Sequence, residues 1–61
     1  MIKINNLPTY ATEYRYVVAT LDLATGDLWF WGAFNEMEKV FSVMEERSTA
    51  QWFRSEDVVP A

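Results

Sequence analysis

The side chains that could carry out chemistry in this 61-residue chain are almost all oxygen-based. The sequence contains no His and no Cys, so the commonest general base, the thiol nucleophile and the usual soft metal ligands are missing. The acidic residues form three close pairs: Asp22 with Asp27, Glu45 with Glu46, and Glu56 with Asp57. Solvated surface charge explains such pairs without catalysis, so we expect no enzyme activity, no metal and no cofactor.

The charge balance restricts the class of partner. Nine acidic residues against five basic ones give a net charge of −4, which disfavours direct binding to nucleic acid or to anionic membranes. The turn Thr25-Gly26 lacks the repeated glycines and the Lys of a phosphate loop. No apolar run is long enough for a membrane span or a secretory leader. We therefore expect a cytoplasmic protein whose partner is a basic or neutral protein.

Two strands and a tight turn are predicted in the first half of the chain. Residues 13–21 and 28–34 are rich in the aromatic and β-branched side chains that suit a pleated surface. The intervening loop places Asp22 opposite Asp27 and contains Gly26, which can adopt the positive φ that such a hairpin loop requires. The first strand therefore pairs with the second, with Leu21 opposite Leu28.

A helix over 36–47 follows, with Asn35 as its cap and Glu38 completing a capping box. Its apolar positions have helical spacing and are Met37, Val40, Phe41 and Met44. A third strand covers 50–55, and 56–61 is a turn that ends at Pro60. Residues 1–12 are predicted to be an irregular arm with a short strand at 2–4. The prediction is one α+β domain over 1–61, a three-stranded antiparallel sheet in the order β-β-α-β with the helix on one face.

An alternative fold rests on the segment Trp52-Phe53-Arg54-Ser55-Glu56-Asp57-Val58-Val59-Pro60. An aromatic strand that runs through a short turn into a Val-containing strand resembles the closing segment of SH3-like barrels. The resemblance covers about nine residues and implies a small β-barrel in place of the α+β sheet.

The two faces of the predicted hairpin differ in what they have to bury. Strand alternation places Val17, Ala19 and Leu21 on the face that receives the helix. The opposite face is predicted to expose an aromatic surface that binds a partner, formed by Tyr14, Tyr16, Trp29, Trp31 and Trp52. Tyr and Trp are frequent interface hot spots. Two alternatives stay open, because the N-terminal arm or a second copy of the chain could cover this face.

The acidic residues indicate a second element of recognition. A negative surface with an aromatic anchor could occupy the basic nucleic-acid site of another protein, as a DNA mimic. The candidate charges are Asp22, Asp27, Glu36, Glu38, Glu45, Glu46, Glu56 and Asp57. In size and charge the chain is similar to the inhibitors that phages and mobile elements encode against host enzymes and defence effectors. The alternative function is a homodimeric assembly protein whose aromatic sheet face forms the self-interface.

Overall fold

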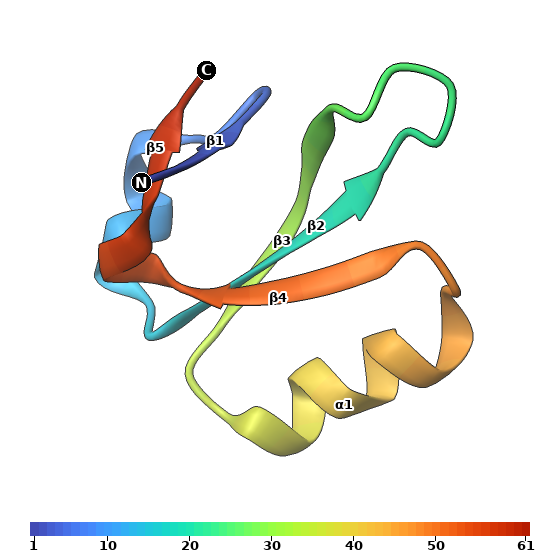
Figure 1. Cartoon of the computed structure of the whole chain (residues 1–61). Helices are drawn as coiled ribbons and strands as arrows, with labels where there is room; N and C mark the ends of the chain where they lie inside the picture. Colours follow the sequence, from blue (N-terminus) through green and yellow to red (C-terminus); the bar gives the residue numbers. More distant parts are fainter.

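A computed structural model describes all residues of the chain, 1–61, as one three-stranded sheet with a helix on one side and a smaller two-stranded sheet on the other (Figure 1). Five strands, one α-helix and two 3-10 helices follow one another along the chain: β1 (Ile2–Ile4), η1 (Thr9–Glu13), β2 (Tyr16–Leu21), β3 (Leu28–Phe34), α1 (Met37–Glu46), β4 (Ala50–Arg54), η2 (Ser55–Asp57) and β5 (Val58–Pro60).

The larger sheet has the order β3-β2-β4, and β2 pairs antiparallel with both neighbours. This open sheet with one helix confirms the predicted α+β class and is not a closed barrel. The hairpin loop also forms as predicted, because the N–H of Asp22 donates to the carbonyl of Asp27 at 2.8 Å and Gly26 has φ 78°. Helix α1 connects β3 to β4, which run parallel to each other on either side of β2.

A β-bulge in β3 changes the predicted register halfway along the hairpin. Leu21 pairs with Leu28 and Ala19 with Phe30, as expected, but Val18 then pairs with Gly32 and Tyr16 with Phe34. Trp31 is the extra residue on the bulged strand. Beyond it, every side chain of β3 lies on the face opposite to the predicted one.

The first core lies between the sheet and the N-terminal segment. Its buried members are Ile4, Ala11, Val17, Ala19 and Val58, and partly buried Phe30 and Phe53 pack against them. The predicted helix face is therefore covered by β1, η1 and β5. The short strand expected at 2–4 forms as β1, but the segment that follows is not wholly irregular, because it contains η1. The tail is not a simple turn either, because β5 pairs parallel with β1, Ile4 opposite Pro60. The strand, turn and strand expected for residues 52–60 do form.

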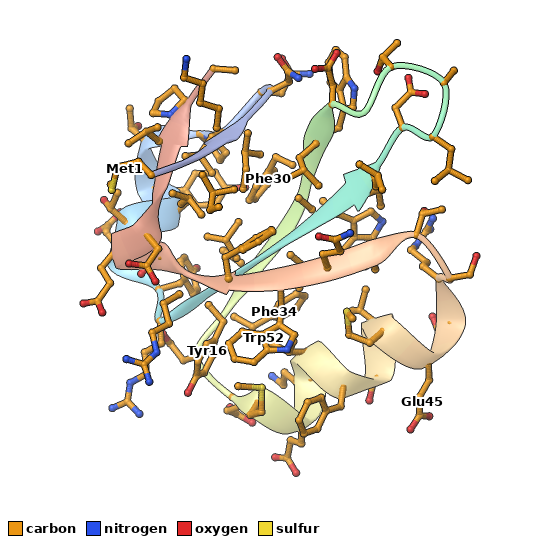
Figure 2. The ribbon with its side chains drawn as sticks, viewed as in Figure 1. Met1, Tyr16, Phe30, Phe34, Glu45 and Trp52 are labelled. Carbon is orange, nitrogen blue, oxygen red and sulfur yellow. The ribbon has the colours of Figure 1, made fainter.

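The second core lies between the sheet and α1, on the face that was predicted to be open. It contains Val18, Val40, Val43 and Ala50. Figure 2 shows Tyr16, Phe34 and Trp52 on this side and Phe30 on the other. The prediction reversed the two faces because alternation identifies which side chains share a face but not which segment covers it.

The helix also differs from its prediction in two respects. Glu36, not Asn35, is the residue at the N-terminal cap, and its side chain makes no capping hydrogen bond. The Asn35 Oδ1 instead accepts the N–H of Arg15 at 3.0 Å, which ties the start of β2 to the end of β3. Val43 is buried while Phe41 is 53% exposed, so the helix is rotated relative to the predicted stripe.

Candidate protein-binding surface

Two tryptophans of β3 form the best-defined exposed aromatic pair. Trp29 is 42% exposed and Trp31 is 39% exposed, although both faces of the sheet are otherwise covered. They stand two residues apart, so both side chains project from the helix-bearing face. On the outer side of β3 only the bridge of Asn5 to Trp29 is present, and no strand covers the edge beside Trp31.

Contacts with the helix end and with β3 hold the Trp31 side chain in place. The Arg47 guanidinium carbon lies 5.0 Å from the centroid of the Trp31 ring, a cation–π contact. The ring of Phe34 stacks on Trp31 with centroids 6.3 Å apart. A rigid, partly exposed indole loses little conformational entropy when it is buried in an interface. Trp29 has no aromatic or cation–π partner, so its exposed area has no comparable structural role.

A second aromatic group lies near the β4 edge of the same side. Trp52 is 37% exposed and makes an edge-to-face contact with Tyr16, with ring centroids 5.7 Å apart. Phe41 was predicted to be in the core but is 53% exposed. With Val40 and Val43 buried against the sheet, helical periodicity turns position 41 toward the β4 side of a right-handed β3-α1-β4 connection. A sequence signal for its exposure exists: Glu38 and Glu45, at i−3 and i+4, surround position 41.

Tyr14 lies apart from the other predicted aromatic residues. It precedes β2 and contacts the ring of Tyr10, which in turn packs edge-on against Phe30 on the N-terminal side of the sheet. The predicted continuous surface is therefore divided. Tyr14 is on one side of the molecule, and on the other side the β3 tryptophans and Trp52 belong to opposite edge strands of the sheet.

The eight candidate carboxylates occupy three separate places. Asp22 and Asp27 are in the hairpin loop, where the Asp22 carboxylate accepts the N–H of Ala24 at 3.0 Å and so has a structural role. Glu36, Glu38, Glu45 and Glu46 belong to the exposed side of α1, and Glu56 and Asp57 to η2. Glu36 and Glu56 each form an exposed ion pair, with Lys39 and Arg54, at 3.8 Å. These charges do not follow a single face.

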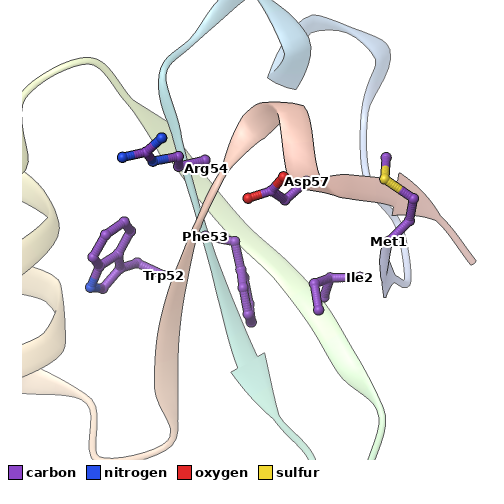
Figure 3. Close-up of a pocket in the computed structure, with 6 residues that line it drawn as sticks. All are labelled: Met1, Ile2, Trp52, Phe53, Arg54 and Asp57. Atoms are coloured by element: carbon purple, nitrogen blue, oxygen red, sulfur yellow. The ribbon is translucent and has the colours of Figure 1, made fainter.

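Two open grooves flank the C-terminal half of β4. One, of about 510 Å³, is lined by Met1, Ile2, Trp52, Phe53, Arg54 and Asp57. Figure 3 shows Trp52 pointing toward α1, with Phe53 and Ile2 on the other side of β4. The other groove, of about 370 Å³, is polar and contains Arg15 and Arg54 together with Glu13 and Glu56. None of the three acidic pairs predicted from the sequence lines either groove as a pair.

Comparison with protein-family models, with curated proteins and with solved structures finds no match to this chain. The single α-helix is too short and too polar to cross a membrane. No three His, Cys, Asp or Glu side chains lie together in an arrangement that could hold a metal ion.

Proposed function

We propose that this protein is a small acidic binding module that docks on another protein through Trp29 and Trp31. The observation that carries the proposal is their exposure on β3 in a chain that covers both faces of its own sheet. Large aromatic side chains of this kind supply most of the binding energy in many interfaces, because each buries a large rigid area.

The carboxylates near the indole pair favour a basic partner. Asp27 precedes Trp29 by two residues, and its main chain pairs with that of Asp22 across the loop. Glu46 precedes Arg47, the residue that contacts Trp31. With a net charge of −4, the chain is steered toward positive surfaces. We infer that the target handles nucleic acid and that docking blocks its basic site, in the manner of a DNA mimic.

Inhibition of a host enzyme or of a defence effector by a phage or mobile element is the biological role that this size and charge fit best. Such targets act in the cytoplasm, which is the compartment that the proposal assigns to the protein. Enzyme activity has no part in this proposal, because the chain carries no His or Cys. We assign its carboxylates to hydrogen bonding in the hairpin loop, to the solvated surface of the helix and to attraction of a basic partner.

The test is a capture experiment from nuclease-treated bacterial lysate with three matched baits: the native chain, Trp29→Ala, and Leu23→Ala at the exposed tip of the hairpin loop. We expect the native chain and Leu23→Ala to retain one basic protein, and Trp29→Ala to lower its recovery about tenfold or more, as for a hot-spot residue. The captured protein, once purified, should release bound DNA when the native chain is added. Equal recovery by all three baits, or capture without competition against DNA, would contradict the proposal.

A further inference from the structure

The outer edge of β4 carries main-chain groups that no part of the chain satisfies. The N–H of Leu21 donates to Thr49 and the N–H of Ser55 donates to Arg15, both at 2.9 Å. Because hydrogen-bonded and free residues alternate along an antiparallel pair, Gln51 and Phe53 direct their main-chain groups to β2. Trp52 directs its N–H and carbonyl outward and Arg54 directs its N–H outward, where the sheet has no further strand.

The features that normally protect an edge strand are missing here. The pairing of β4 with β2 runs from Ala50 to Arg54 without a bulge, and the strand contains no Pro. Its one charged residue, Arg54, is at its end. A regular, exposed edge of this kind is a template for pairing with another strand.

We propose that this edge pairs with the same edge of a second copy, so that two chains form a continuous six-stranded sheet with a two-fold axis at Trp52. In this antiparallel register Trp52 lies opposite its own copy, Gln51 opposite Phe53, and Arg54 opposite Ala50. The N–H of Trp52 donates to the Trp52 carbonyl of the second copy, and the N–H of Arg54 to its Ala50 carbonyl. The proposal is independent of the partner assigned to Trp29 and Trp31.

The side chains beside the edge favour a second copy over an unrelated strand. A two-fold axis at Trp52 brings the two Trp52 indoles together on the helix-bearing face. Phe41, 53% exposed on the flank of α1 that faces β4, then approaches the same seam from each chain. Apolar surface that is solvent-exposed in one chain becomes shared between the two.

Charge also selects this register. Pairing centred on Arg54 would place two guanidinium groups directly opposite each other, which is destabilising. Pairing centred on Trp52 instead places Arg54 beside Ala50 of the second copy. Ala50 follows the C-terminal end of α1 by four residues, where Glu46 and the negative end of the helix dipole attract a cation.

The test measures molecular mass by sedimentation over a wide range of protein concentration. The key variant is Arg54→Pro, because Arg54 already has φ −70° and ψ 138°, values that Pro accepts, and its N–H has no partner within the chain. Arg54→Ala is the matched control, since it removes the same side chain and retains the N–H. Phe41→Glu adds a like charge at the seam on a position that is exposed in the single chain.

We expect the native chain to approach twice its 7.1 kDa mass as concentration rises. Loss of two symmetry-related hydrogen bonds should raise the dissociation constant of Arg54→Pro about tenfold or more relative to Arg54→Ala. Phe41→Glu should weaken the dimer and Trp29→Ala should leave it unchanged. A native chain that stays at 7.1 kDa up to about millimolar concentration, the range of weak contacts, overturns the proposal. So does a dimer that Phe41→Glu fails to weaken, even if Arg54→Pro does not fold.

Discussion

The two edges of the central sheet are built in opposite ways. At the β3 edge, the N–H of Asn5 donates to Leu28 at 2.8 Å and the Asn5 carbonyl accepts the N–H of Phe30 at 2.9 Å. The bulge at Trp31 then interrupts the rest of the strand. At the β4 edge the ladder is regular, and the outward N–H groups of Trp52 and Arg54 face no further strand.

This difference shows which parts of the sheet the short N-terminal segment can cover. The N-terminal segment covers one sheet face and one edge at the same time, because β1 leads directly from the buried Ile4 to Asn5. None of residues 1–61 pairs with the outer side of β4. The protected edge carries the exposed tryptophans to which we assign a partner of different sequence, whereas the open edge offers the main-chain groups that we propose pair with a second copy.

The largest expected effect comes from placing Pro at two positions of β4. Gln51→Pro removes an N–H that faces β2 and should lower the free energy of unfolding by about 3 kcal/mol or more. Arg54→Pro removes an outward N–H and should change it by less than about 1 kcal/mol. Denaturant unfolding at dilute concentration measures both. Equal losses of unfolding free energy would mean that the N–H groups of Gln51 and Arg54 have been assigned wrongly to the inner and outer sides of β4.

The bulge of β3 can be perturbed at Gly32. A Cβ there would lie 3.1 Å and 3.2 Å from two ring atoms of Phe34, and that ring is held by Trp31 and the helix-side core. Gly32→Ala should therefore cost about 1–2 kcal/mol. The loss should shrink in a Phe34→Leu background, where the smaller side chain gives way. A stabilised Gly32→Ala protein would show that the ring moves freely.

The turn that follows the Asn5 bridge is sensitive to backbone conformation. Asn6 has φ 60°, a left-handed value that Asn and Gly tolerate better than other residues. Asn6→Ala should lower stability by about 1 kcal/mol, and Asn6→Gly should preserve it within a few tenths. Thermal unfolding distinguishes them, since 1 kcal/mol shifts Tm by about 4–8 °C in a domain of this size. Similar Tm values for the two variants would argue against the left-handed turn.

The smallest effect is expected at the Asn5 side chain. Its Nδ2 donates to the Leu28 carbonyl at 3.1 Å, which also accepts the Asn5 main-chain N–H. Asn5→Ala leaves that carbonyl satisfied, so the loss should be only about 0.5 kcal/mol. Asn5→Asp, which retains the shape without the donor, is the matched variant for the same denaturant titration. A loss above about 2 kcal/mol would show that the side chain, not the main chain, closes the β3 edge.

Local sequence signals predicted the three strands of the larger sheet, the short strand at 2–4, the loop at Gly26 and the helix correctly, because each depends on neighbouring residues. Strand β5 was predicted to be a turn, since its pairing partner β1 lies at the other end of the chain. The assignment of faces was wrong for a physical reason. Val17 and Val18 are equally apolar, so nothing local decides which of them meets the helix. The bulge at Trp31 breaks the alternation of side chains, and alternation alone does not reveal where such a break occurs. Phe41 was wrongly placed in the core because α1 is rotated about its axis relative to the predicted apolar stripe, which buries Val43 instead. The binding role of Trp29, Trp31 and the other aromatic residues stays a prediction.

Residue-resolved amide hydrogen exchange, in dilute and in concentrated protein, tests the contrast between the edges most directly. In dilute protein, Gln51, Phe53 and Phe30 should exchange slowly because their N–H groups are bonded, and Trp52 and Arg54 should exchange fast. At high concentration, Trp52 and Arg54 should become protected while the other three change little. Slow exchange of Trp52 and Arg54 in dilute protein, together with fast exchange of Gln51 and Phe53, would contradict the open β4 edge.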